Sequence, residues 1–196
     1  MTRRKRLFYW LVLLLLPMSG RKRAEFIRKH KLYGAVGQNC SIMKRKIPLY
    51  SNLIFLHDNV RIASNVGFVT HDGIHHILNF MYRESNFVER IGCIEIMNNV
   101  FIGSSTQIRY NTRIGNNVII GANSFVSKDI PDNSVYAGMP ARYICSFDEY
   151  VEKQRKYSET FRDKYGIDGV HGVDDALAAI MYKEFKKQKD TKNSVS

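Results

Sequence analysis

The sequence has few cysteines and few prolines, and no run of apolar residues that could cross a membrane. Its 196 residues include only Cys40, Cys93 and Cys145, which are widely spaced and form no Cys-x-x-Cys pair. This pattern indicates neither a disulfide framework nor a zinc site, and reduced thiols in a cytosolic setting are expected. With 44% hydrophobic and 24% charged residues, the composition is that of an ordinary folded protein with one principal domain.

Acidic residues are almost absent from the start of the chain. Residues 1–46 hold 13 of the 30 Lys and Arg residues and one acid, Glu25, whereas the rest holds 17 basic and 17 acidic residues. The net charge of +12 therefore belongs to the N-terminal arm. A nucleic-acid-binding face would interleave basic and stacking aromatic residues across the main domain, and no such pattern follows residue 46. We expect no nucleic-acid partner.

The arm contains the apolar run LFYWLVLLLL at residues 7–16, with basic residues on both sides. As a helix this run would be about 15 Å long, which is half of a bilayer core, so it cannot span a membrane. Three roles stay open: a peripheral membrane anchor within residues 1–29, a helix packed on the domain or on a sister subunit, and a signal peptide. The anchor would hold a cytoplasmic protein on the inner face of the cell membrane.

A period of six residues dominates the middle of the chain. From residue 96 the sequence reads IMNNVF, IGSSTQ, IRYNTR, IGNNVI, IGANSF and VSKDIP, and the same phase holds in LHDNVR, IASNVG and FVTHDG from residue 56. Neither a helix nor an ordinary strand has this period, which is typical of a solenoid. Three hexads would form one three-sided coil, with the leading aliphatic residues stacked in a continuous core. The glycines that follow them suit turns that need little side-chain volume or a positive φ.

The phase breaks once, because Phe68 and Ile96 lie 28 positions apart. Residues 73–90 carry no hexads and are predicted to form a loop that leaves the solenoid after His71 and Asp72. Such long loops are often functional, although a tolerated surface loop is the alternative.

The hexads end near Pro131, and two helices are predicted beyond them. Ser146 and Glu149 match a capping box that opens a charged helix reaching about Tyr165. Gly166, Gly169 and Gly172 mark a linker, a second helix runs over about 174–187, and residues 188–196 form a frayed tail. We therefore predict a helical arm at 1–31, a solenoid at 32–145 with the loop 73–90, and C-terminal helices with the tail at 146–196.

The hexads, Val69-Thr70-His71-Asp72 and the segment IIGANSFVSKDIPDNSVYAGMPARYI at residues 119–144 resemble the bacterial hexapeptide-repeat acyltransferases. The likeness is greatest to the branch of xenobiotic, maltose and polysaccharide O-acetyltransferases, and covers roughly residues 30–148. It implies a mainly β fold, the left-handed parallel β-helix. It also implies homotrimers with active sites between subunits, acetyl-CoA lying along the coils, and a histidine at position 71 that takes a proton from the acceptor hydroxyl.

Elementary chemistry also favours His71 as the general base. A hydroxyl needs a positioned base to attack a thioester, and imidazole titrates nearest to neutral pH. Asp72 is a poor orienting partner because neighbouring strand residues point to opposite faces, which leaves Glu84 and Glu89 as candidates. The alternative is that His71 has no catalytic role and that its ring is hydrogen-bonded within a turn.

His75 and His76 could line the acceptor pocket or be solvated loop residues. Together with His71 they also suggest a metal site, as in the γ-class carbonic anhydrases. The ligand spacing of that class is not matched, so no metal is expected.

For acetyl-CoA, the family's contacts carry over onto five residues: Ser104, Ala122, Ser127, Lys128 and Arg142. Small residues at 104 and 122 would let the pantetheine lie against the backbone, although hexad turns favour small residues in any case. Arg142 could pair with phosphates of CoA. Many relatives have a second basic residue where this chain has Cys145.

We therefore predict an acetyl-CoA-dependent O-acetyltransferase that acts on a sugar hydroxyl in the synthesis of capsular, extracellular or other surface polysaccharides. The alternatives within enzymes are N-acetylation of an amino-sugar nucleotide and O-acetylation of an antibiotic. A non-catalytic solenoid scaffold is the alternative from another class.

Overall fold

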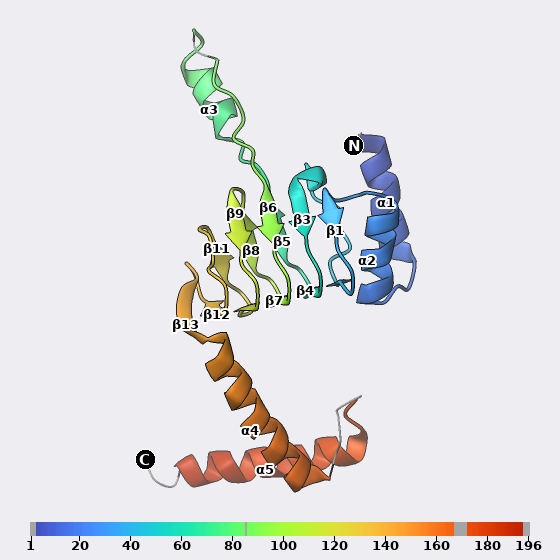
Figure 1. The fold of residues 1–196 in the computed structure, drawn as a ribbon, viewed down its shortest axis with the longest axis vertical. Helices are drawn as coiled ribbons and strands as arrows, with labels where there is room; N and C mark the ends of the chain where they lie inside the picture. The colour runs from blue at the N-terminus through green and yellow to red at the C-terminus, as the bar shows by residue number, and fades with distance from the viewer. Residues whose placement is uncertain (1–2, 85, 167–171, 194–196) are drawn as a thin grey trace. The chain divides into compact units, whose positions relative to one another are not determined.

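A computed structural model describes residues 3–84, 86–166 and 172–193 (Figure 1). The chain consists of two compact units, residues 1–150 and residues 151–196. The first unit holds three parallel sheets, which we call A, B and C, and each is described with its strands below.

The strands visit the three sheets in turn, so that successive hexads occupy successive sides of a coil (Figure 1). Sheet A contains β1 (Ala35–Val36), β3 (Ile54–Leu56), β6 (Ile94–Ile96) and β9 (Thr112–Ile114). Sheet B contains β2 (Ser41–Ile42), β4 (Val60–Ile62), β7 (Val100–Ile102), β10 (Val118–Ile120), β12 (Ser134–Ala137) and the antiparallel β13 (Arg142–Ser146). Sheet C contains β5 (Gly67–Val69), β8 (Gln107–Arg109) and β11 (Phe125–Val126).

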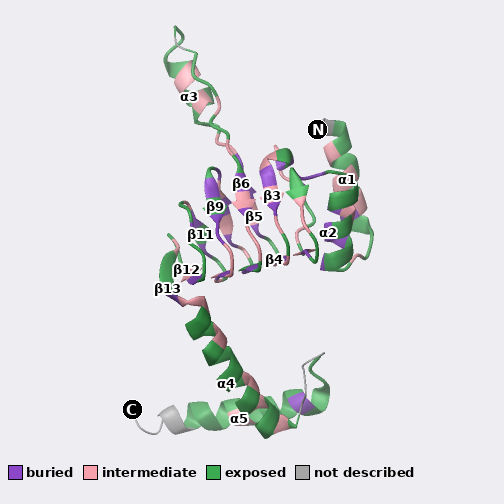
Figure 2. Cartoon of the chain, viewed as in Figure 1, coloured by how far each residue is buried: buried purple, intermediate pink, exposed green. Residues whose placement is uncertain are grey.

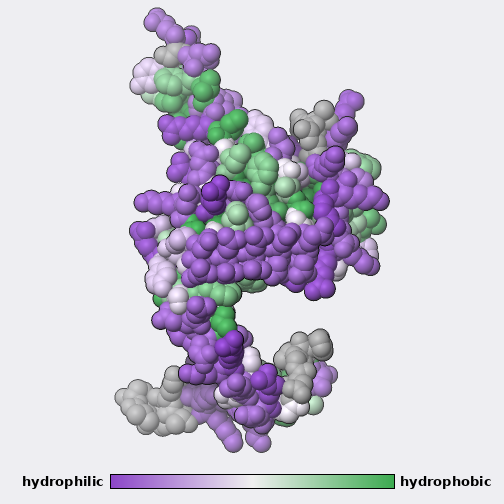
Figure 3. Space-filling model, viewed as in Figure 1, coloured by the Kyte–Doolittle hydropathy of each residue, from purple (hydrophilic) through white to green (hydrophobic). Residues whose placement is uncertain are grey.

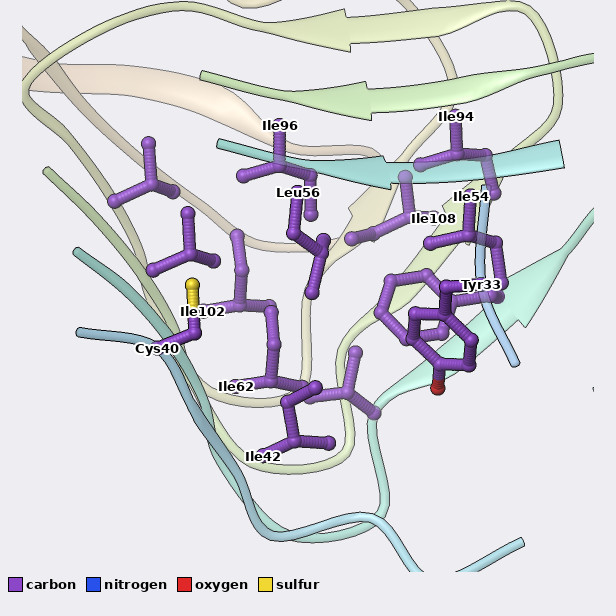
Figure 4. Close-up of a cluster of buried hydrophobic side chains, with 14 of the residues drawn as sticks. Tyr33, Cys40, Ile42, Ile54, Leu56, Ile62, Ile94, Ile96, Ile102 and Ile108 are labelled. Carbon is purple, nitrogen blue, oxygen red and sulfur yellow. The ribbon is translucent and has the colours of Figure 1, made fainter. Parts of the chain in front are cut away.

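The core confirms the predicted hexad columns. Ile102 pairs with Ile62 on one side and with Ile120 on the other, so each leading aliphatic lies above its counterpart in the next coil. These residues are buried, as Figure 4 shows for the Ile62, Ile96, Ile102 and Ile108 side chains. The small or β-branched residues at the fifth place are buried as well: Val60, Val66, Val100, Thr106, Thr112, Val118 and Ser124.

The corners from sheet A to sheet B are built from asparagines. Five asparagines at these corners have a positive φ of 51–60°: Asn39, Asn59, Asn99, Asn117 and Asn133. Each amide donates to the amide oxygen of the next at 2.8–3.0 Å, which makes a continuous asparagine ladder. Asparagine tolerates this left-handed conformation better than other residues with a Cβ. On the face that Figure 3 shows, a continuous hydrophilic band crosses the coil.

Of the two reasons predicted for the hexad glycines, small side-chain volume or a positive φ, the structure supports the first. Gly103, Gly115 and Gly121 are not among the positive-φ residues. A Cβ at Gly103 would lie 2.4 Å from the backbone nitrogen of Ala122 in the next coil. Close approach of coils, and not φ, requires glycine there.

A charged cluster lies on sheet A. Glu95 accepts hydrogen bonds from Arg113 Nε at 2.7 Å, and its other oxygen lies 3.0 Å from His57 Nε2. The hydrogen bonds from His57 and then from Arg113 lower the pKa of Glu95 below its usual value.

The N-terminal arm forms two helices where one was predicted, α1 (Arg3–Leu15) and α2 (Gly20–Lys29). Pro17 lies in the break between them, and Ser19 caps α2 by accepting from Lys22 N. The helix α2 packs on the first coil: buried Arg23 donates to the carbonyls of Ile42 and Met18, each at 2.7 Å. A solenoid must cover its open end, and α2 does so here.

The excursion predicted as a loop contains the helix α3 (Ile74–Met81). Asp72 N donates to Arg90 O and Gly92 N donates to Thr70 O, both at 3.0 Å, so the two ends of the excursion pair where they leave the coil. No residue of α3 is buried (Figure 2). The helix forms because Ile74, Ile77 and Met81 recur at helical spacing, a period that hexads do not have.

The C-terminal helices are α4 (Phe147–Tyr165) and α5 (Asp175–Asn193). The predicted capping box is confirmed, since Glu149 N donates to Ser146 Oγ and Ser146 N donates to the Glu149 carboxylate. The predicted tail was placed too early, because α5 continues to Asn193. Gly169 of the predicted linker and residues 194–196 of the tail lie outside the described residues. None of the described helices is both long and apolar enough to cross a bilayer.

Candidate active site

His71 lies at the corner between sheets C and A, where the chain leaves the coil. It follows β5 and Thr70, and it forms an isolated antiparallel bridge with Ile91 on the returning strand of the excursion. The side chain is half-buried, and so remains open to a ligand. The backbone hydrogen bonds between the two ends of the excursion hold the backbone of His71 in place.

The Thr70 hydroxyl contacts the imidazole of His71. The Thr70 hydroxyl donates its single hydrogen to Leu49 O at 2.8 Å, and its oxygen lies 3.3 Å from His71 Nδ1. Because that hydrogen is already used, the hydroxyl can only accept a hydrogen bond from the ring, which favours the tautomer with its proton on Nδ1. The lone pair is then on Nε2, which is the state that a general base requires.

Tyr50 packs against the same ring. The two ring centroids are 5.2 Å apart at 83°, and the Tyr50 hydroxyl donates to Glu89 Oε2 at 2.7 Å. This hydrogen bond to Glu89 raises the pKa of Tyr50. Glu89, a predicted orienting partner, therefore holds Tyr50 and not His71. Glu84, the other predicted orienting partner, makes no hydrogen bond to His71 among the described residues.

Asp72 bonds away from His71. Its carboxylate accepts from the Tyr110 hydroxyl at 2.7 Å and from Ile74 N at 3.2 Å, and Arg109 donates to the same hydroxyl at 3.1 Å. The hydrogen bond from Tyr110 lowers the pKa of Asp72. Asp72 thus anchors the start of the excursion, and it does not orient the base.

Three of the predicted CoA residues line one groove. Ser127, Lys128 and Arg142 surround a hollow of about 450 Å³ together with Tyr136 and Tyr143. Lys128 and Arg142 are exposed, so both cations are available to an anionic ligand. The groove is suited to phosphate groups beside an aromatic wall.

The register of sheet C relates this groove to His71. Val69 pairs with Arg109 and Val126 pairs with Ile108, so Ser127 is in register with Val69, two residues before His71, and both segments then turn from sheet C toward sheet A. The strands β5 and β11 lie two coils apart, which is about 10 Å at the usual strand separation. A ligand bound in the groove can therefore extend along the corner to the imidazole.

Ser104 and Ala122 are placed elsewhere, at the corner between sheets B and C. They stack in consecutive coils, where Asn123 N donates to Ser104 O at 2.7 Å, and both are exposed. The strand β11 separates them from the groove, so the five predicted residues form two groups. Cys145 is buried in β13, and so does not reach the groove.

His75 and His76 lie on α3, with their rings stacked at 4.0 Å. Throughout the part of the chain that the structure describes, no group of three His, Cys, Asp or Glu side chains could hold a metal ion.

Two residues of the site were missed by sequence reasoning. Thr70 is next to His71, but the alternation of strand side chains argued against contact between neighbours. Tyr50 precedes the short 3-10 helix η1 (Ser51–Leu53) and belongs to no hexad, so no pattern marks it.

Parallel three-sided coils of hexads with an open histidine define a hexapeptide-repeat protein, and comparison with known proteins agrees. Residues 94–128 match the family described as bacterial transferase hexapeptide (six repeats). Protein CapG of Staphylococcus aureus is 40% identical over 126 residues, which is 63% of this chain and 72% of that protein. The chain belongs to this hexapeptide-repeat family.

Two acetyltransferases are among the similar proteins. The galactoside O-acetyltransferase of Escherichia coli (strain K12) is 45% identical over 92 residues, 46% of this chain; the matched part spans only 43% of that enzyme. A solved galactoside acetyltransferase in complex with coenzyme A superposes with a TM-score of 0.54 at 29% identity, over 76% of this chain and 84% of that one.

Proposed function

We propose that this protein is an acetyl-CoA-dependent O-acetyltransferase whose acceptor is a sugar hydroxyl. The observation that carries the proposal is the contact of the Thr70 hydroxyl with His71 Nδ1, which favours a free lone pair on Nε2, near the groove of Lys128 and Arg142. The similarity to galactoside O-acetyltransferase supports a sugar acceptor and acetyl-CoA as the donor. We further propose that the coils wind left-handedly, as in the family.

The transfer is direct. His71 Nε2 takes the proton of the acceptor hydroxyl as its oxygen attacks the acetyl carbonyl, and a tetrahedral intermediate forms. The intermediate collapses, the carbon–sulfur bond breaks, and the imidazolium returns the proton to the leaving thiolate. The products are the sugar ester and CoA, and His71 ends in its starting state. The Nδ1 proton stays hydrogen-bonded to the Thr70 hydroxyl throughout, and this hydrogen bond stabilises the imidazolium.

The groove binds the donor in this scheme. Arg142 and Lys128 pair with phosphates of CoA, and the pantetheine arm extends along the corner toward His71. Ser104 and Ala122, at the other edge of sheet C, offer exposed backbone against which a second part of the ligand can lie. The excursion at 73–90 contributes the acceptor pocket, because it begins directly after His71.

A homotrimer completes the site in this proposal. Ile77 and Phe80 of α3 are 64% and 77% exposed, which is costly in water unless a neighbouring subunit covers them. The acceptor belongs to surface-glycan synthesis, and the protein works on the cytoplasmic side of the membrane. Sedimentation velocity tests the assembly: a monomer at micromolar concentration would contradict it.

The activity is tested with radiolabelled acetyl-CoA and a panel of galactosides, glucosides and capsule-type oligosaccharides. We expect label in an ester that mild base removes, because the acceptor atom is oxygen. Acceptors with every hydroxyl methylated are the control. Label in a base-stable amide would show N-acetylation instead, and an absence of CoA binding by calorimetry would leave only the scaffold.

A further inference from the structure

The outer face of α1 is apolar and uncovered. Its inner face packs on the protein: Leu13 is fully buried, and the Tyr9 ring lies 6.0 Å from that of Phe26. The outer face presents five large side chains that are 41–75% exposed, Leu7, Phe8, Leu11, Leu14 and Leu15. A surface helix in water normally turns its polar side outward, so this face requires an apolar surrounding.

A groove with two cations borders this face. Arg6, Leu7, Trp10, Lys46 and Ile47 line a hollow of about 300 Å³. Its cationic side chains suit a phosphate, and its apolar walls suit the hydrocarbon attached to one. A phospholipid has both parts adjacent in one molecule, whereas free phosphate would use only the cations.

Further basic residues are fixed beside the helix. Arg45 Nη1 donates to Leu14 O at 2.8 Å, at the end of α1, and so holds this residue and its neighbour Lys46 beside the helix. Residues 1–46 contain 13 basic residues and one acid. A second copy of the arm would therefore be repelled, and the remainder of the chain, with 17 basic and 17 acidic residues, has no excess of negative charge to attract it.

We propose that the outer face of α1 docks on an anionic phospholipid surface, with a headgroup phosphate between Arg6 and Lys46. The helix lies in the plane of the interface, since it is too short to span the bilayer. This proposal is independent of the proposed acetyl transfer.

Trp10 allows a direct test because it is the chain's single tryptophan and lines the groove. The full chain is titrated with vesicles of phosphatidylcholine containing about one third phosphatidylglycerol, with brominated or unbrominated acyl chains. We expect the Trp10 emission to shift to the blue, and the brominated chains to quench it. Equal quenching by pure phosphatidylcholine would overturn the requirement for anionic lipid. A shift with inorganic phosphate alone, or vesicle binding without quenching, would overturn docking through the apolar face.

Matched variants locate the contact. Phe8→Glu should abolish quenching, whereas Phe185→Glu on α5, where the side chain is 52% exposed against 61% for Phe8, should leave it unchanged. Lys46→Gln should weaken vesicle binding roughly fivefold, as expected for one basic residue near the surface, with Lys183→Gln as its control. Circular dichroism confirms that each variant is folded. Equal losses in the variants and their controls would refute the assignment to α1.

Discussion

Gly103 tests whether the close stacking of the coils shapes the donor site. In Gly103→Ala the new Cβ would lie 2.4 Å from Ala122 N and 2.7 Å from both Ala122 Cα and Gly121 C. All three are backbone atoms, so no side chain can turn away. An ordinary contact needs about 1 Å more, and overpacking of this kind costs about 2 kcal/mol. For a chain of this size, that lowers Tm by roughly 4–8 °C.

The matched control is Gly73→Ala. There the nearest atom to a new Cβ is His76 Cδ2 at 3.7 Å, and φ is −103°, so alanine fits without strain. We expect its stability to change by less than about 0.5 kcal/mol. Thermal and urea unfolding, followed by circular dichroism, measure both variants.

The same variant has a functional consequence. Ser104 and Ala122 flank the strained contact, so Gly103→Ala should also weaken CoA binding in calorimetry, whereas Gly73→Ala should not. If Gly103→Ala were as stable as the parent protein and bound CoA equally well, the stacking geometry derived for this corner would be wrong.

Three further predictions follow from the groove, the charged cluster and the ladder. Arg142→Gln should weaken CoA binding about tenfold, because a charge-assisted hydrogen bond is lost. Arg155→Gln on α4 is the control and should bind CoA with the affinity of the parent protein. Equal affinities of the two variants by calorimetry would show that Arg142 does not bind CoA. Since the folded-state pKa of Glu95 is lowered, its carboxylate stabilises the fold above the ordinary Glu pKa, and this stability is lost as pH falls through the lowered value. Glu95→Gln should therefore cost up to about 1 kcal/mol at pH 7 and nothing in strong acid, and a cost independent of pH in urea titrations would contradict the ion-pair account. Asn99→Gly keeps a residue suited to the φ of 60° but removes two hydrogen bonds of the asparagine ladder, so it should lower the free energy of unfolding by about 1 kcal/mol. Asn65→Gly is the control, because Asn65 has the same φ of 60° but lies outside the ladder, and its free energy of unfolding should not change. Equal unfolding free energies for the two variants would show that the amide links contribute no stability.

The coil could be predicted from the sequence because its period is repeated and local. Each hexad supplies its own strand and turn, so columns such as that of Ile102 and Ile120 predict which residues stack. The turn chemistry was harder, because the sequence left small volume or a positive φ open for the glycines, and asparagines such as Asn99 and Asn117 supply the positive φ. The structure decides between the two reasons at Gly103, where the close approach of Ala122 in the next coil requires glycine.

The rest depended on contacts that no pattern announces. The break before α2 has its sequence sign in Pro17 and the cap Ser19, yet the burial of Arg23 could not be foreseen, since charged residues are buried only when particular carbonyls receive their hydrogens. In the site, His71 was found from its motif. Its partners Thr70 and Tyr50 were not, because Tyr50 lies outside the repeats and meets the ring only through the fold.

The most direct measurement of the central claim is the rate of acetyl transfer by His71→Ala, made alongside calorimetry of CoA binding. If the Nε2 lone pair acts as the base, the rate should fall by roughly 10²–10⁴, while the affinity for CoA, which rests on the groove of Lys128 and Arg142, stays the same. A variant that folds, binds CoA and transfers acetyl at nearly the parental rate would contradict the role assigned to His71.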